Sequence, residues 1–202
     1  MVHRSQETLV TNDDRSSGPF TTLFVCRENI ARSRIAEYVT RDRLEQRFGP
    51  DAKNQCVVTS AGTSVRGLSD IHPLARRILQ DRGVEIPHED SKQVTVEMIE
   101  NASLILTATR SERMKIAQIS PPSVQRMFTI LQFARLCAAS DFTNVRTGDH
   151  LLGLARRGQS RSHPAPHLDD LSDPSSNRDQ FQECVTKITC AVDSILNNLK
   201  AP

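Results

Sequence analysis

The stretch that decides the fold is residues 21–33, which read TTLFVCRENIARS. Its first six residues, Thr21–Cys26, are β-branched, aromatic or apolar, which is typical of a buried strand. Five residues separate Cys26 from Arg32, and the apolar residues then recur at the helical spacing, which predicts a helix over 31–48 that a Gly-Pro pair ends. A strand that turns through a short loop into a helix is a unit of α/β folds.

The rest of the chain repeats this alternation. Further strands are predicted at 56–60, 104–109 and 126–130, and further helices at 72–82, 111–119, 131–139 and 177–199. Ser111 suits the N-cap of the helix that it begins. The pattern predicts an α/β fold in one domain: a four-stranded parallel sheet with helices on both faces, and a loop after the first strand that could bind phosphate.

Two segments are expected to lie outside the regular structure. Residues 1–20 are polar without periodicity, which predicts a disordered N-terminal arm before a domain that spans 21–199. Residues 140–172 form a long basic insertion, rich in Arg, His and Pro, with a short helix at 151–156. A stretch of this length without structure is expected to be functional or mobile, and its arginines are interpreted as a solvated face.

Composition excludes several classes of protein. The formal net charge is +2 with 37% hydrophobic residues, so no clustered basic field indicates a nucleic-acid partner, and no apolar run is long enough to cross a bilayer. The N-terminus lacks the apolar stretch of a signal peptide, which favours a cytoplasmic location. Five widely spaced cysteines predict free thiols rather than a disulfide framework, and no Cys or His spacing suits a metal site.

The loop between Cys26 and Arg32 is suited to holding an anion. Five residues between a strand and a helix can turn their backbone N–H groups inward, and the helix N-terminus adds its own donors. Arg32 can grip two phosphate oxygens at once, and the same positive surroundings favour the nucleophilic thiolate of Cys26. Ser33 is placed to donate a hydrogen bond to that sulfur, and Asn29 suits a left-handed turn within the loop.

On these residues the chain resembles the low-molecular-weight protein tyrosine phosphatase family, bacterial type, whose loop reads V-C-x-G-N-x-C-R-S. The residues that match this loop are Val25, Cys26, Asn29, Arg32 and Ser33. Two later segments agree in order: Thr59–Thr63 is similar to the family's S-A-G-T, and Ser172–Pro174 to its late D-P. The resemblance covers roughly residues 21–199.

The resemblance implies a two-step phosphatase reaction that needs no cofactor and no metal. Cys26 would form a phosphocysteine, Arg32 would clamp the phosphate, and Asp173 would act as general acid and then as general base. Ser60 would order the loop through Asn29. The remaining residues of the phosphate loop are Arg27, Glu28, Ile30 and Ala31. The implied partner is a phosphotyrosine protein or a small aryl phosphate.

Four positions depart from the family pattern. Glu28 stands where the family has Gly, and its carboxylate would repel a phosphate unless it points outward toward Arg27 or Arg34. Ala31 replaces a second loop cysteine, so an oxidised Cys26 lacks that nearby thiol. Arg27 and Ser175 stand where the family has apolar or aromatic pocket walls, which weakens the case for an aryl substrate.

Alternatives remain open at this point. Asp169 and Asp170 are rivals of Asp173 for the acid, although neither precedes a proline. The same scaffold can reduce arsenate, but that chemistry needs relay cysteines after the third strand, where this chain has none. A catalytically weak module that binds phosphate or phosphoproteins is the non-enzymatic alternative, motivated by Glu28 and Ser175.

Overall fold

The computed structural model describes residues 19–139, 153, 168–174 and 177–197. The predicted N-terminal arm and most of the 140–172 insertion, with its short helix at 151–156, therefore lie outside the described residues.

The centre of the fold is a parallel sheet in the order β2-β1-β3-β4. Its strands are β1 (Phe20–Cys26), β2 (Cys56–Gly62), β3 (Leu104–Thr107) and β4 (Met127–Thr129). The register sets Cys26 beside Gly62 and Val25 beside Thr107. Because all strands run in the same direction, their carboxyl ends meet at one edge of the sheet, where ligands bind in open α/β folds. The predicted four-stranded parallel sheet is confirmed.

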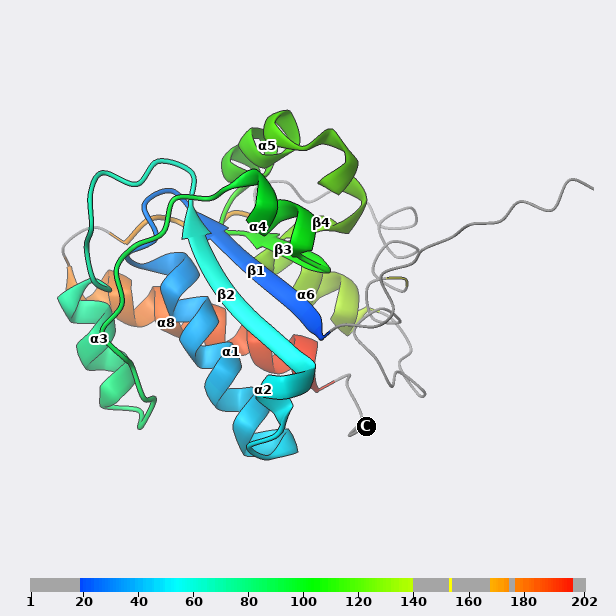
Figure 1. The fold of residues 1–202 in the computed structure, drawn as a ribbon. Helices are drawn as coiled ribbons and strands as arrows, with labels where there is room; N and C mark the ends of the chain where they lie inside the picture. Colours follow the sequence, from blue (N-terminus) through cyan, green and yellow to red (C-terminus); the bar gives the residue numbers. More distant parts are fainter. Residues whose placement is uncertain (1–18, 140–152, 154–167, 175–176, 198–202) are drawn as a thin grey trace, which may run out of the picture.

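Helices cover both faces of this sheet, as predicted (Figure 1). One face packs against α1 (Arg32–Phe48), α3 (Pro73–Gln80), α6 (Ile130–Ala138) and α8 (Arg178–Leu196). The other packs against α4 (Val96–Asn101) and α5 (Arg110–Ile119). Strand β1 lies inside the sheet and alternates its side chains between the two cores: Leu23 and Val25 face α4 and α5, whereas Phe24 and Cys26 face α1 and α8.

Some local predictions need correction. The short helices α2 (Ala52–Gln55) and α4 and a 3₁₀ helix at Pro121–Arg126 were not predicted, because four to six residues are too few to show a helical period. Ser111 is not the N-cap of α5. Thr109 occupies that position, and its Oγ1 accepts a hydrogen bond from the backbone N–H of Ser111 at 3.2 Å. Strand β3 accordingly ends at Thr107.

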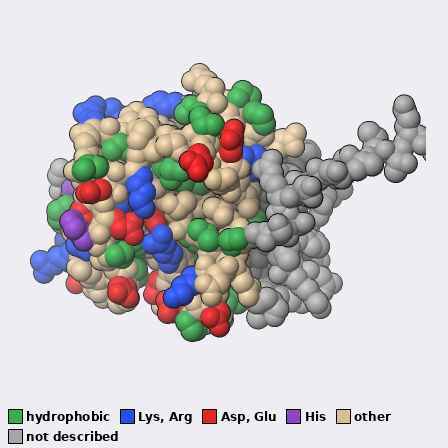
Figure 2. Space-filling view, in the orientation of Figure 1, with side chains coloured by type: hydrophobic (Ala, Val, Ile, Leu, Met, Phe, Trp, Pro, Cys, Tyr) green, Lys and Arg blue, Asp and Glu red, His purple; other side chains and the backbone are tan. Residues whose placement is uncertain are grey.

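The surface carries both signs of charge. In the face shown in Figure 2, Lys and Arg alternate with Asp and Glu rather than gathering into one field, in keeping with the near-neutral net charge. None of the described helices combines the length and apolar character that a membrane crossing requires.

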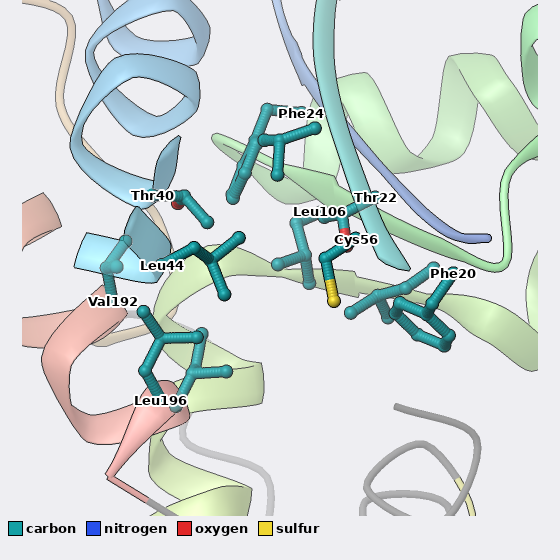
Figure 3. A pocket seen from close by; sticks show the side chains of 12 residues that line it. Phe20, Thr22, Phe24, Thr40, Leu44, Cys56, Leu106, Val192 and Leu196 are labelled. Atoms are coloured by element: carbon teal, nitrogen blue, oxygen red, sulfur yellow. The ribbon is translucent and has the colours of Figure 1, made fainter. Parts of the chain in front are cut away.

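An apolar cavity of about 60 Å³ lies between the sheet and helices α1 and α8 (Figure 3). Its lining includes Phe20 and Cys56, where β1 and β2 begin, and none of the residues from Cys26 to Arg32. Its lining is almost entirely hydrocarbon, with Leu44 and Leu196 prominent. A phosphate would lose its hydration there without gaining a charged partner, so this cavity is not the anion site.

Candidate active site

The sulfur of Cys26 lies against two polar groups where β1 ends. The residue is only 2% exposed. The backbone N–H of Asn29 points at Sγ from 3.3 Å, and the Ser33 hydroxyl lies 3.0 Å from it, in a geometry that allows either atom to donate. Helix α1 begins at Arg32, so its amino end directly follows the loop that contains Asn29. Such donors stabilise a negative charge on sulfur and on an oxyanion held against it.

Asn29 holds the loop in shape. It is the one non-glycine residue with positive φ (58°) in the described part of the chain, as the sequence predicted. Its side-chain amide donates to the hydroxyls of Ser33 at 3.0 Å and Ser60 at 2.7 Å, and its carbonyl oxygen accepts from the backbone N–H of Lys92 at 2.8 Å. The left-handed turn is thus fixed from three segments of chain, because every polar atom of the Asn29 side chain is occupied.

The loop also rests on β2 at Gly62. Backbone N–H groups of Thr63 and Ser64 donate to the carbonyls of Cys26 at 2.9 Å and Arg27 at 2.7 Å. A Cβ at Gly62 would lie 2.8 Å from the Arg27 carbonyl oxygen and 3.0 Å from the Asn29 nitrogen. The glycine of the S-A-G-T segment is therefore required by close approach of two backbones rather than by its φ.

Sequence reasoning missed a buried acid behind the loop. Glu37 of α1 is fully buried and accepts a hydrogen bond from the Ser60 hydroxyl at 2.5 Å. Arg41, one turn later, approaches its other carboxylate oxygen to 2.5 Å and also donates to the Val58 carbonyl. A chain of contacts thus runs from Cys26 to Arg41, and its successive members are Ser33, Asn29, Ser60 and Glu37. The only sequence signal was an acid and an arginine four residues apart on a helix, which ordinarily indicates an exposed pair.

Burial raises the pKa of Glu37 above its ordinary value of 4.5, and Arg41 and the Ser60 hydrogen bond oppose this only in part. The folded protein therefore binds a proton at Glu37 more tightly than the unfolded chain does. We expect the free energy of unfolding of the wild type, relative to Glu37→Gln, to be highest below pH 4.5 and to fall as pH rises through the raised pKa. Urea unfolding of both proteins across this range measures the difference; a difference that grows with pH contradicts the assignment.

Arg32 is the first residue of α1, at the end of the same loop, and is almost completely buried. Its Nη2 lies 3.0 Å from Asp173 Oδ2, and its Nη1 donates to the Leu171 carbonyl at 3.1 Å. Its buried Nε has no hydrogen-bond partner among the described residues. A guanidinium held at one end, with a donor still unused, is suited to receiving an oxyanion.

The structure separates the three candidate aspartates. Asp169 pairs with Arg135 at 3.1 Å and Asp170 with Arg110 at 3.1 Å, so both are neutralised away from the loop. Between them and Asp173, Leu171 is buried and its N–H donates to the carbonyl of Ala108, the residue just after β3. That anchor brings Asp173 alone to Arg32, with 62% of its side chain exposed and thus within reach of a substrate.

The other loop residues stand as follows. Ile30 and Ala31 take part through their backbones: the Ile30 carbonyl accepts from the N–H of His72, and the Ala31 carbonyl from the N–H of Ile35. Glu28 lies 3.9 Å from Arg27 and 3.8 Å from Arg66.

The expectation that Glu28 could turn to Arg34 is wrong. Arg34 is completely buried, where it donates to the Tyr38 hydroxyl and to the carbonyls of Glu89 and Asp90 at 2.8–3.0 Å. Its guanidinium is thus already held by the Tyr38 hydroxyl and two backbone carbonyls, and Glu28 lies near the exposed arginines Arg27 and Arg66 instead.

The sequence model of the family described as "Low molecular weight phosphotyrosine protein phosphatase" matches residues 21–143, which is more than half of the 202-residue chain. The chain belongs to this family. The matched span contains the Cys26 loop, Ser60 and Gly62, whereas Asp173 lies beyond it.

Relatives of this phosphatase family differ in the substrate that they are named for. The protein-arginine-phosphatase of Geobacillus stearothermophilus is 29% identical over 115 residues, 57% of this chain and 72% of that protein. The low molecular weight protein-tyrosine-phosphatase PtpA of Staphylococcus epidermidis is 32% identical over 114 residues, 56% of this chain and 70% of that protein.

Solved structures agree on the fold. The YwlE arginine phosphatase of G. stearothermophilus superimposes with a TM-score of 0.64 at 22% identity, covering 89% of this chain and 92% of that one. The low molecular weight phosphotyrosine phosphatase of Vibrio cholerae O395 gives a TM-score of 0.66 at 20% identity, covering 88% and 95%. At such identities the likeness establishes the phosphatase fold and not the substrate.

The remaining cysteines of this low molecular weight phosphatase sit in different surroundings from Cys26. Burial raises the pKa of Cys137 and of Cys184 to about 12, so both thiols stay protonated at neutral pH. Cys190 is exposed, and all five cysteines are free. No group of three or more His, Cys, Asp or Glu side chains that could hold a metal ion occurs within the described ranges.

Proposed function

We propose that this chain hydrolyses phosphotyrosine in proteins through a phosphocysteine intermediate on Cys26. The observation that carries the proposal is one short loop with a sulfur in contact with two polar groups at its start and, at its end, the buried guanidinium of Arg32 paired with the accessible carboxyl of Asp173. A nucleophile, an anion clamp and an acid are the parts that phosphoryl transfer to sulfur requires.

In the first step the Cys26 thiolate attacks phosphorus opposite the leaving oxygen. The S–P bond forms as the P–O bond to the phenol breaks, and Asp173 donates its proton to the departing oxygen. Arg32 and the loop N–H groups hold the remaining phosphoryl oxygens, and they act most strongly where charge accumulates in the transition state. In the free protein the Asp173 carboxylate pairs with the Arg32 guanidinium, so this ion pair has to break as the phosphate binds.

The second step returns the enzyme to its initial state. Asp173, now ionised, takes a proton from a water molecule whose oxygen attacks phosphorus, and the S–P bond breaks to release phosphate and the thiolate. The Ser33 hydroxyl, 3.0 Å from Sγ, stabilises the sulfur as it leaves. The positioning contacts of Asn29, Ser60 and Gly62 keep the loop in one shape through both steps.

Phosphoarginine is the rival substrate, since one relative is named for it. The rim of this site favours tyrosine, because it carries two arginines, Arg27 and Arg66, against one acid, Glu28. The guanidinium of phosphoarginine would approach like charges there, whereas a phenol is neutral. A cytoplasmic location stays a prediction from the sequence.

Three peptides of one sequence, carrying phosphotyrosine, phosphoarginine or phosphoserine at the same position, test the proposal. We expect kcat/KM to be at least about tenfold higher for phosphotyrosine, because its phenol is a better leaving group than serine and lacks the charge of arginine. Release of inorganic phosphate measures all three. Faster release of phosphate from the phosphoarginine peptide would mean that phosphoarginine, and not phosphotyrosine, is the substrate. Tight binding without release of phosphate from any peptide would identify a binding module.

A further inference from the structure

Two arginines stand at the rim of the site with little to hold them. Arg27 directly follows the nucleophile candidate in sequence, and its side chain is 51% exposed; Arg66 follows β2 and is 72% exposed. Both approach one carboxylate oxygen of Glu28, from 3.9 Å and 3.8 Å, which is beyond hydrogen-bond distance. Two positive charges therefore share one negative charge, and the donors of both guanidiniums remain able to bind a further acceptor.

The loop that carries Arg66 is held to the phosphate loop at its start. The backbone N–H of Ser64, two residues before Arg66, donates to the carbonyl of Arg27 at 2.7 Å. The next N–H, of Val65, donates to the Gln93 side chain at 3.0 Å. Since successive Cα atoms are about 3.8 Å apart, Arg66 cannot lie far from Arg27.

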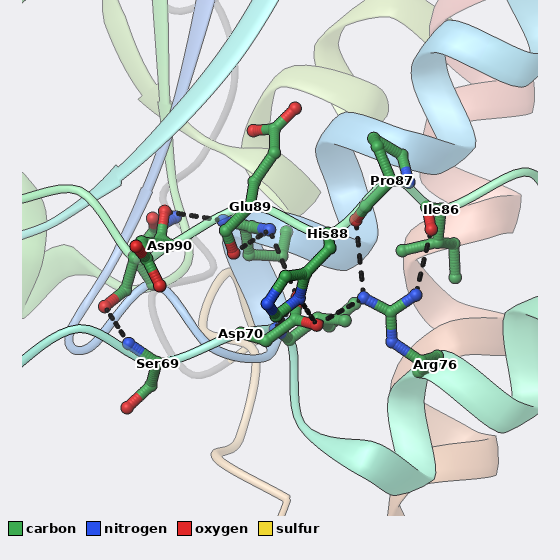
Figure 4. Close-up of polar contacts among 12 residues, drawn as sticks. Ser69, Asp70, Arg76, Ile86, Pro87, His88, Glu89 and Asp90 are labelled. Atoms are coloured by element: carbon green, nitrogen blue, oxygen red, sulfur yellow. Dashed lines mark hydrogen bonds and ion pairs between the residues drawn. The ribbon is translucent and has the colours of Figure 1, made fainter.

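The far end of the same loop is fixed as well (Figure 4). Asp70 accepts hydrogen bonds from Arg76 at 2.6 Å and from the backbone N–H of Ile71 at 2.7 Å, and its Oδ2 lies 2.5 Å from His88 Nδ1. The carbonyl of Ser69 accepts a hydrogen bond from the backbone N–H of Ser91 at 2.8 Å. With both ends tied, the loop presents Arg66 in a restricted region, which lowers the entropy that binding would cost.

We propose that Arg27 and Arg66 form a carboxylate-binding pair at the rim and that the preferred substrate is a phosphotyrosine flanked by Asp or Glu. Glu28 serves as an internal substitute for the substrate carboxylate, keeping the pair together until an acidic peptide arrives. The proposal rests on the proposed function, because the phosphate in the loop sets where the flanking residues lie.

The size of the effect follows from the exposure of the pair. Contacts between solvent-exposed charges are individually weak, so two of them give a preference of about two- to thirtyfold in kcat/KM, which corresponds to about 0.4–2 kcal/mol. Because the charges face solvent, the preference should shrink as ionic strength rises above about 0.15 M, where the screening length is about 8 Å.

The test uses two phosphotyrosine peptides that differ only in having Asp and Glu or Asn and Gln beside the phosphotyrosine. The readout is the ratio of kcat/KM for the acidic peptide to that for the amide peptide, measured for each protein. Arg27→Gln and Arg66→Gln should each lower the ratio, and the double variant should bring it to about one. Glu28→Gln should raise it, since both arginines are then released. Arg47→Gln, an equal charge change near the far end of α1, is the matched control and should leave the ratio unchanged.

Each other outcome overturns the inference. A wild-type ratio of one, or a ratio below one, means that the rim does not select carboxylates. A high ratio that survives in the double variant assigns the preference to other residues. If the protein proves not to hydrolyse phosphotyrosine at all, the same two peptides are titrated against Cys26→Ser by fluorescence anisotropy. Equal affinities would then refute the carboxylate pair separately from the failure of the proposed function.

Discussion

Cys26→Ser is expected to abolish the hydrolysis of p-nitrophenyl phosphate, lowering kcat by roughly 10⁴-fold or more. The substitution exchanges sulfur for oxygen at one buried atom that contacts Asn29 N–H and the Ser33 hydroxyl. A serine hydroxyl can make the same contacts, so the loop should keep its shape. A serine hydroxyl is a far weaker nucleophile than a thiolate, so turnover through the covalent intermediate is lost.

Cys190→Ser is the control for this change, because Cys190 is a free, exposed cysteine on α8. We expect it to retain full activity and an unchanged thermal midpoint. Loss of activity in both variants would point to a general requirement for thiols, and retention of activity in Cys26→Ser would remove Cys26 from the mechanism.

Asp173→Ala is expected to slow the hydrolysis of phenyl phosphate by about 10²-fold or more, and that of p-nitrophenyl phosphate much less. The poorer leaving group needs a proton as the P–O bond breaks, whereas p-nitrophenolate departs without one. Removal of Asp173 also frees the Arg32 guanidinium that it contacts at 3.0 Å in the free protein. We therefore expect inorganic phosphate, a competitive inhibitor, to bind the variant more tightly than the wild type.

Asp170→Ala is the matched control, since Asp170 lies on the same segment but pairs with Arg110. It should show no dependence on the leaving group. If Asp173→Ala slows both substrates equally, the general acid is another residue; if Asp170→Ala shows the leaving-group effect instead, the assignment of the two aspartates is reversed.

Much of this arrangement could be predicted because it is local in sequence. The strand, the five-residue loop and the helix after it are contiguous, so hydrophobic periodicity locates Cys26 and Arg32 without tertiary information. Asn29 was expected to adopt a left-handed turn because few other residues tolerate positive φ, and it does. The parallel sheet followed from the alternation of elements, since parallel strands need crossovers.

What could not be predicted depends on contacts between distant segments. The sequence favours Asp173 over its two neighbours only through the proline after it, whereas the contact of Leu171 with Ala108, just after β3, accompanies the pairing of Asp173 with Arg32. Glu37 resembled a solvated helix residue until β2 placed Ser60 against it. Arg66 joined Glu28 because two loops meet across the edge of the sheet, and no spacing within one segment records that meeting.

The most direct test of the central claim is to look for phosphate on the sulfur. The protein is mixed with a ³²P-labelled phosphotyrosine peptide, quenched with acid within the first turnover, and digested. We predict label on the peptide that contains Cys26, and none there in Cys26→Ala. Steady turnover with no labelled peptide, or label on any other residue, would contradict the account.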